Sequence, residues 1–226
     1  MALNKKNQRD KPTVVLLIRH GQNDWVGKNK LAGWTPGVRL NKLGRAQAAA
    51  TGQRLASEDI AAVYSSPLER TVETAQAIAQ PHKLKVQFQK MLGEVDYGQW
   101  TGKSIAKLSK TDAWPVVQFY PSAARFPGGE SLFEMQARAV QEINRLVEAH
   151  PGQTIVIVSH ADLIKSVIAH YLGTHLDLFQ RIVVSPASIT RVAFLKMGPR
   201  IITVNDTGHL HELENERMKK SRKRKK

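Results

Sequence analysis

The stretch Thr13–Gly21, TVVLLIRHG, carries an apolar run directly into Arg19, His20 and Gly21. A short apolar run bounded by a polar turn predicts a buried β-strand, here Thr13–Ile18. The strand would deliver the three following residues to the edge of a sheet. Arginine presents a planar set of donors that matches a phosphate group, histidine can be a nucleophile or a proton carrier at neutral pH, and glycine lets the backbone approach a ligand. The triplet therefore indicates phosphoryl chemistry.

The composition predicts one globular domain. The 226 residues are 42% hydrophobic, which is enough to bury a sizeable core. The chain has no cysteine, so disulfides, zinc–thiolate sites and a cysteine nucleophile are excluded. No apolar run approaches the roughly 20 residues of a membrane-spanning helix, and the N-terminus lacks the apolar segment of a signal peptide. We therefore expect a cytoplasmic protein.

The net charge of +15 is concentrated at the two ends of the chain. Residues 217–226 contribute eight Lys or Arg and no acidic residue, and residues 1–11 contribute a net charge of +3, which leaves +4 for residues 12–216. We expect a disordered basic N-terminus over 1–11, a folded domain over 12–210 and a basic tail over 211–226. The tail suits contact with nucleic acid or an anionic surface, although a solvated end is the simpler interpretation.

Apolar runs alternate with helical patterns along the domain, which predicts an α/β fold. Further strands are expected at Ile60–Ser65, Lys85–Gln89, Thr154–Ser159, Ser188–Leu195 and Arg200–Val204. Helices are expected at 42–57, after Ser66, at 131–150 and at 162–171. Residues 91–129 are rich in Gly, Pro and aromatic residues, and we expect them to form an irregular insertion over one end of the sheet.

Two local patterns predict how the first two helices begin and face. Ser66 is expected to cap the second helix, with Glu69 closing a capping box. In the helix at 42–57, one face is expected to point to the core; it carries Leu43, Ala46 and Ala50.

Polar residues follow several of the predicted strands, and ligands of open α/β sheets bind beyond the carboxyl ends of strands. Arg70 lies in the first turn of the helix after the second strand, and His160 follows the strand at 154–159. Together with Arg19 and His20 they would gather two histidines, two arginines and helix amides at a spot that attracts a doubly charged phosphate. A surface ion pair between Arg70 and a glutamate of its own helix is the alternative.

A metal site is the main chemical rival. His20 and His160 are able to bind a metal ion together with Asp24 or Asp162. However, Arg19 beside His20 would repel a cation, and no His-x-x-x-His or paired-carboxylate motif supports a metal. We therefore expect no metal and no other cofactor.

Five segments, taken in chain order, resemble a known family. They are Leu17–Gly21, Tyr64–Ala75, Glu94–Gly102, Phe126–Ser131 and Val158–His160. The set resembles the histidine phosphatase superfamily, also called phosphoglycerate mutase-like, over about residues 13–207. The resemblance implies a three-layer α/β/α sandwich with a mostly parallel, mixed sheet.

The resemblance also implies roles for the site residues. His20 would attack phosphorus and carry a phosphohistidine, while Arg19, Arg70 and His160 would bind the phosphoryl oxygens and stabilise charge in the transition state. Glu94 would protonate the leaving oxygen and then help to activate water. His20 must be unprotonated at one nitrogen to attack, so we expect a backbone acceptor at its other nitrogen.

The chain departs from the family pattern after the first motif and at the last. Where the family often has Glu, then Thr or Ser, and later Asn, this chain has Gln22, Asn23 and Val26. The Asn23 amide is expected to replace the hydroxyl as a phosphate donor, whereas Val26 has no donor. Ala161 stands where glycine is usual, and its backbone amide is expected to bind phosphate. The segment 205–210, NDTGHL, resembles a subgroup described as probable phosphomutases.

The sequence favours a phosphatase over a mutase. Mutases of this superfamily typically carry a longer insertion with a double-arginine segment after the third motif. That stretch has no such pair here and contains Lys103, Lys107, Lys110 and Arg125. We therefore expect a phosphomonoester phosphatase that acts on a small phosphorylated metabolite, with a phosphoglycerate mutase-like phosphomutase as the alternative. A non-catalytic phosphate-binding protein is disfavoured because both histidines, both arginines and Glu94 are present.

The substrate and the assembly stay open at this stage. Aromatic residues in and near the insertion would either line an apolar substrate pocket or pack a lid; they are Trp100, Trp114, Phe119 and Tyr120. The expected partner is a small phosphate ester, and a homodimer is an open alternative to a monomer.

Overall fold

A mixed six-stranded sheet forms the centre of the computed structural model, which describes residues 11–213 and 215. The strand order is β3-β2-β4-β1-β5-β6. The first four strands in this order are parallel; β5 pairs antiparallel with β1, and β6 pairs antiparallel with β5. The strands are β1 (Thr13–Arg19), β2 (Ile60–Ser65), β3 (Val86–Phe88), β4 (Thr154–Ser159), β5 (Ile189–Leu195) and β6 (Gly198–Asp206).

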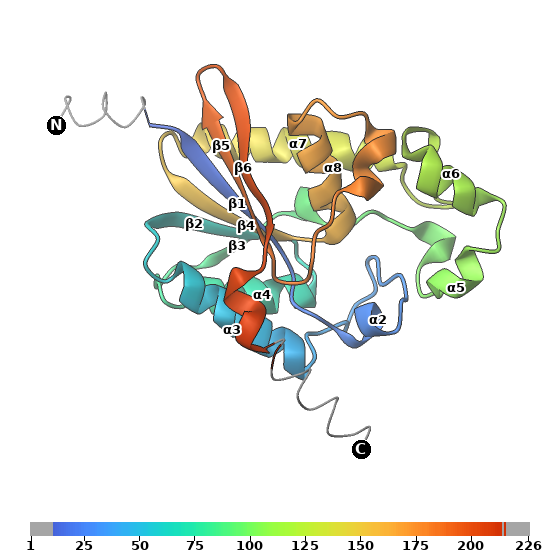
Figure 1. Cartoon of the computed structure of the whole chain (residues 1–226), viewed down its shortest axis with the longest axis horizontal. Helices are drawn as coiled ribbons and strands as arrows, with labels where there is room; N and C mark the ends of the chain where they lie inside the picture. Colours follow the sequence, from blue (N-terminus) through green and yellow to red (C-terminus); the bar gives the residue numbers. More distant parts are fainter. Residues whose placement is uncertain (1–10, 214, 216–226) are drawn as a thin grey trace.

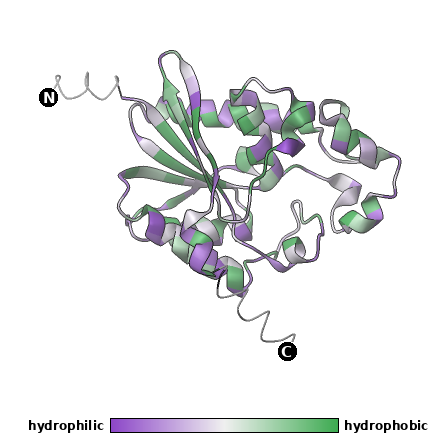
Figure 2. Cartoon of the chain, viewed as in Figure 1, coloured by the Kyte–Doolittle hydropathy of each residue, from purple (hydrophilic) through white to green (hydrophobic). Residues whose placement is uncertain are grey.

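Helices cover both faces of the sheet (Figure 1). Leu16 and Ile18 of β1 face α3 and α4, while Val15 and Leu17 face α7 and α8, as alternation along a strand requires. Figure 2 shows the strands as a hydrophobic centre between more polar helix surfaces. The main helices are α3 (Lys42–Leu55), α4 (Glu69–Ala79), α7 (Leu132–Ala149) and α8 (Ala161–Tyr171). The expected three-layer α/β/α sandwich is confirmed.

The predicted core face of α3 is wrong. Leu43, Ala46 and Ala50 are only half-buried, and the buried residues are Gly44, Ala48, Thr51, Gly52 and Leu55. The helix packs by small residues because backbone approaches it on two sides. A Cβ on Gly44 would clash with the Gln22 carbonyl, and one on Gly52 would clash with that of Ala77 in α4.

Ser66 does not cap the next helix. Helix α4 begins at Glu69, and its N-cap is Leu68, whose side chain makes no capping hydrogen bond. The Ser66 hydroxyl instead contacts His160 Nε2 at 2.9 Å. Glu69 reaches outward, where its carboxylate accepts from the Gly37 amide at 2.8 Å. The predicted cap is therefore wrong: Ser66 follows the end of β2 and precedes the N-cap of α4.

The stretch 91–129 is more ordered than expected. It forms short helices that lie beyond α2 (Asp24–Gly27), at the end of the molecule away from β2 and β3 (Figure 1). They are η2 (Gly98–Trp100), α5 (Ile105–Leu108), α6 (Ala113–Phe119) and η3 (Pro121–Ala123), preceded by η1 (Lys90–Leu92). After α8 the chain forms η4 (Leu176–Arg181), and after β6 it forms η5 (Gly208–Leu210).

The predicted basic ends lie largely outside the described residues, so the domain limits of 12 and 210 stay a prediction. Within the part of the chain that the structure describes, no helix has both the length and the apolar character needed to cross a membrane.

Candidate active site

The carboxyl ends of β1, β2 and β4 meet at one point. In the register of the parallel strands, Arg19 is opposite Ser159, and Ser65 is opposite Val158. The His20 amide donates to the Ser159 carbonyl at 3.0 Å, which extends this pairing by one residue. The rings of His20 and His160 therefore lie edge to face, with centroids 5.3 Å apart. The sheet thus brings the two predicted histidines together.

His20 is held in the tautomer that a nucleophile needs. Its Nδ1 lies 2.7 Å from the Gly21 carbonyl, which can only accept, so Nδ1 carries the hydrogen and Nε2 keeps a free lone pair. The predicted backbone acceptor is therefore confirmed. Burial, together with the charges of Arg70 and Arg19, holds the pKa of His20 well below its usual value. The ring is neutral at neutral pH.

Gly21 serves packing more than ligand approach. A Cβ at this position would lie 2.5 Å from the carbonyl oxygen of Gly44 in α3. The Gly21 amide donates to the Thr74 hydroxyl of α4 at 3.1 Å. Two helices thus press on the backbone next to His20, and a side chain here would displace it.

Arg70 is fully buried and not on the helix surface, so the surface ion pair is wrong. Its Nη2 donates to the Gly33 carbonyl at 2.8 Å and approaches His160 Nδ1 at 3.2 Å. Arg19 donates from Nη1 to the Val184 carbonyl at 2.7 Å. Three other guanidinium nitrogens are buried and have no partner: Arg70 Nε, Arg70 Nη1 and Arg19 Nε.

Asn23 adds a fourth unpaired donor. Its Oδ1 accepts from the amides of Trp25 and Val26 at 2.9 Å each and caps α2, while its Nδ2 is buried without a partner. Among the described residues, four of the seven buried side-chain polar atoms without partners belong to Arg19, Asn23 and Arg70. Buried donors are normally paired, so this concentration indicates a site for a ligand rich in acceptors.

A cavity of about 430 Å³ contains these donors. Arg19, His20, Asn23 and Arg70 line it, and so does Ala161 at the start of α8, where helix amides lack intrahelical partners. Val26 also lines the cavity and contributes only apolar surface. The sequence singled out four aromatic residues near this site. Trp100 and Trp114 line the cavity, whereas Phe119 and Tyr120 are exposed and do not line it.

His160 has partners at both ring nitrogens. Because arginine only donates, His160 Nδ1 accepts from Arg70, so Nε2 carries the hydrogen and donates to the Ser66 hydroxyl at 2.9 Å. Burial and the Arg70 charge hold the pKa of His160 well below its usual value. His160 is therefore placed to hold Arg70, and Ser66 is a site residue that the helix-cap interpretation missed.

Glu94 lies in the same cavity and is almost completely buried. Burial, reinforced by the nearby Asp162, raises the pKa of Glu94 to about 7. Its Oε1 accepts from the Val95 amide at 3.0 Å. Asp162 accepts from the Tyr97 hydroxyl at 2.8 Å. A carboxyl group with this pKa is able to give and take a proton near neutral pH.

The predicted rival site for a metal is not assembled. Asp24 is exposed, bonds to Asn41 and does not line the cavity, and Asp162 pairs with Lys165 at 3.6 Å. Over residues 11–213 and 215, no three His, Asp or Glu side chains are grouped in a way that would hold a metal ion.

Comparisons with known proteins agree with this geometry. The chain is 32% identical over 208 residues to a bifunctional protein of Mycobacterium tuberculosis, which covers 89% of this chain but only 56% of that protein. It is 28% identical over 200 residues to phosphoserine phosphatase 1 of Hydrogenobacter thermophilus; the match covers 88% of this chain and 94% of that protein. It is 35% identical over 157 residues to phosphoglycerate mutase-like protein 4 of Arabidopsis thaliana; the match covers 67% of this chain and 68% of that protein.

The fold is shared with solved structures as well. Bacillus stearothermophilus YhfR superposes with a TM-score of 0.83 at 26% identity, covering 88% of this chain and 99% of YhfR. The family model of the histidine phosphatase superfamily, branch 1, matches residues 15–207. With that match, and with the two histidines and two arginines at one sheet edge, this chain belongs to the histidine phosphatase superfamily.

Proposed function

We propose that this chain is a phosphomonoester phosphatase that acts on a small phosphorylated metabolite through a phosphohistidine at His20. One observation carries the proposal: four buried donors without partners surround a histidine whose free nitrogen is set by a backbone carbonyl. A phosphate group supplies the acceptors that these donors lack. We assign the activity to the predicted domain over residues 12–210.

In the first half-reaction, His20 Nε2 forms a bond to phosphorus while the bond from phosphorus to the ester oxygen breaks. Glu94, which is protonated in part at neutral pH, gives its proton to the leaving oxygen. Arg19, Arg70 and the Asn23 amide bind the phosphoryl oxygens, together with the backbone amide of Ala161, and stabilise the charge of the transition state.

In the second half-reaction, water replaces the histidine. Glu94, now a carboxylate, takes a proton from water as the water oxygen bonds to phosphorus and the bond to His20 Nε2 breaks. Phosphate leaves, and Glu94 carries its proton again. We assign His160 a role through Arg70, because its Nδ1 accepts from that guanidinium. Arg70 thereby keeps two nitrogens free for phosphate.

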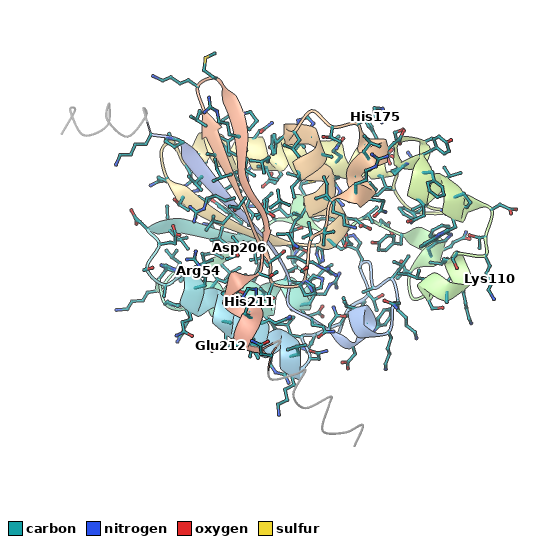
Figure 3. The ribbon with its side chains drawn as sticks, viewed as in Figure 1. Arg54, Lys110, His175, Asp206, His211 and Glu212 are labelled. Atoms are coloured by element: carbon teal, nitrogen blue, oxygen red, sulfur yellow. The ribbon has the colours of Figure 1, made fainter. Side chains whose placement is uncertain are left out.

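A phosphomutase is the second candidate, since one relative is described as phosphoglycerate mutase-like. A mutase needs extra cationic groups to hold a second charged group. The four basic residues of the insertion are all exposed, and none lines the cavity; they are Lys103, Lys107, Lys110 and Arg125. Figure 3 shows Lys110 at the outer edge of the molecule. This arrangement favours water as the acceptor.

Phosphate release and isomerisation separate the two functions. We expect free phosphate to form in step with the loss of a monoester substrate. With 3-phosphoglycerate and a bisphosphoglycerate primer, isomerisation should be slower than phosphate release from the best monoester. Isomerisation that is faster by about tenfold, a difference near 1.4 kcal/mol in barrier, would show that the protein is a mutase.

A further inference from the structure

The cavity extends well beyond the atoms that would hold a phosphate, and part of its lining is aromatic. Trp100 and Trp114 stack with centroids 6.1 Å apart and planes inclined by 22°. Phe126 packs edge-on against Trp100 at 5.3 Å, and Val117 of α6 adds an aliphatic surface. A volume of about 430 Å³ is in the range of pockets that enclose an organic ligand. Trp100, Phe126 and Val117 are almost completely buried, so the half-buried Trp114 is the main aromatic surface that this wall offers to the alcohol part of a phosphate ester.

The lining offers little to a second anion. Lys165 is paired, because it contacts Gln180 at 3.1 Å and Asp162 at 3.6 Å. Lys30 is exposed and lies over the Trp25 ring at 5.8 Å. Within the described residues, the buried cationic nitrogens that have no hydrogen-bond partner all belong to the arginines that we assign to the phosphate. A substrate carboxylate would meet Glu94 and Asp162 instead, and an unpaired charge is costly to bury.

We propose that the preferred substrates are phosphate monoesters of an aromatic alcohol without a second anionic group, the ring packing against Trp100 and Trp114. The inference rests on the proposed phosphatase function and adds the class of its substrate. It separates this chain from relatives described by phosphoserine or phosphoglycerate, whose alcohol parts carry a carboxylate.

Three esters of similar leaving-group reactivity test the proposal: phenethyl phosphate, ethyl phosphate and 3-phosphoglycerate. Packing of the ring should raise kcat/KM for phenethyl phosphate over ethyl phosphate by about 30-fold. For 3-phosphoglycerate, kcat/KM should be lower than for phenethyl phosphate by at least the same factor. Trp114→Ala should lower kcat/KM about tenfold for phenethyl phosphate and less than twofold for ethyl phosphate. The measurement is phosphate release from the full chain.

Phe119→Ala is the matched control, because Phe119 is an exposed aromatic on the same helix and does not line the cavity. This variant should leave kcat/KM unchanged for both phenethyl phosphate and ethyl phosphate. If kcat/KM for ethyl phosphate or 3-phosphoglycerate equals that for phenethyl phosphate, the proposed substrate class is wrong while the phosphatase function stands. If no ester, including activated p-nitrophenyl phosphate, releases phosphate, the proposed function itself fails.

A second, independent observation concerns the segment 205–210, which the reaction does not use. It lies against α3, where the Thr51 hydroxyl is 3.1 Å from His209 Nε2. Between this segment and the active site runs the loop 184–187. On its inner side, the Val184 carbonyl accepts from Arg19, and the Ala187 amide donates to the Arg19 carbonyl at 3.0 Å.

The outer side of the same loop is held by two side chains of the segment. Asn205 Oδ1 accepts from the Ser185 amide at 2.6 Å. His209 Nε2 lies 3.1 Å from the Ala187 carbonyl and 3.1 Å from the Thr51 hydroxyl of α3. The carbonyl can only accept, so a hydrogen on Nε2 is shared between these two oxygens. We infer that Asn205 and His209 are positioning residues that place the Arg19 guanidinium through this loop.

Substitution of Asn205 tests the inference, with orthovanadate as the phosphate-like probe. Asn205 has a φ of 57°, so Asn205→Gly removes the side chain without backbone strain, and Asn205→Asp keeps the acceptor oxygen. Asn205→Gly should weaken vanadate affinity about fivefold by calorimetry, and Asn205→Asp less than twofold. In an Arg19→Ala background, Asn205→Gly should have no further effect. An equal loss in both backgrounds, or no loss with Arg19 present, would overturn the role.

Discussion

Replacing His20 with alanine is expected to lower phosphate release by about ten-thousand-fold or more, because no other group can form the phosphoenzyme. His20 Nε2 is the nitrogen left free when Nδ1 donates to the Gly21 carbonyl. The variant should also fail to form an acid-labile, alkali-stable phosphoprotein when it is mixed with labelled substrate and quenched rapidly. Steady-state phosphate release and this trapping experiment measure the two effects.

His82→Ala provides the control. His82 is half-buried and also has a ring nitrogen without a partner, but it does not line the cavity. This variant should keep its rate and its phosphoenzyme. A phosphoenzyme that persists in His20→Ala would mean that another residue is the nucleophile. Thermal unfolding of both variants separates loss of chemistry from loss of the fold.

The second large effect is expected at Glu94. Because its pKa is about 7, the fraction that carries a proton falls as the pH rises above neutrality. For an alkyl monoester, whose leaving oxygen needs that proton, kcat/KM should fall on the alkaline side with a midpoint near pH 7. Glu94→Gln should lower the rate by about a hundredfold or more and remove this alkaline fall. The leaving group of p-nitrophenyl phosphate needs no proton. With this substrate, Glu94→Gln should therefore slow phosphoenzyme formation less than with an alkyl monoester.

Glu142→Gln is a suitable control, because Glu142 is as buried as Glu94 but pairs with Arg145 on α7. It should leave both the rate and the pH profile unchanged. An alkaline fall that remains in Glu94→Gln would assign the titration to another group and remove Glu94 from the proton-transfer role.

The same pKa predicts a stability effect that does not depend on substrate. Folded Glu94 binds its proton more tightly than in the unfolded chain, where its pKa is close to the usual 4.5. The stability that Glu94 contributes by holding this proton is therefore fully present below about pH 4.5 and is lost as the pH rises toward 7. At pH 8, Glu94→Gln should be more stable than the parent by up to about 3 kcal/mol, and at pH 4 by little. Urea unfolding at the two pH values measures the difference.

The α/β class and most element positions were predictable because they depend on local patterns. Strands β2 and β4 match their predicted limits, since short, continuous apolar runs differ clearly from amphipathic helices. The buried face of α3 was not predictable. Its small residues are selected by the backbones of Gln22 and Ala77, which approach from distant parts of the chain. Likewise, Ser66 has the local sequence of a helix cap, and only its contact with His160 shows its place in the site.

The residue types needed for phosphoryl transfer, and their order behind three strands, can be read from the chain itself. Their chemical states cannot, because each depends on groups far away in sequence. Burial among distant residues raises the pKa of Glu94, and Asp162 adds to it. Arg70 is free to bind phosphate because Gly33 and His160 take one of its nitrogens and leave two without partners. Side-chain chemistry is encoded locally, whereas desolvation and hydrogen-bond partners exist only once the sheet brings its strand ends together.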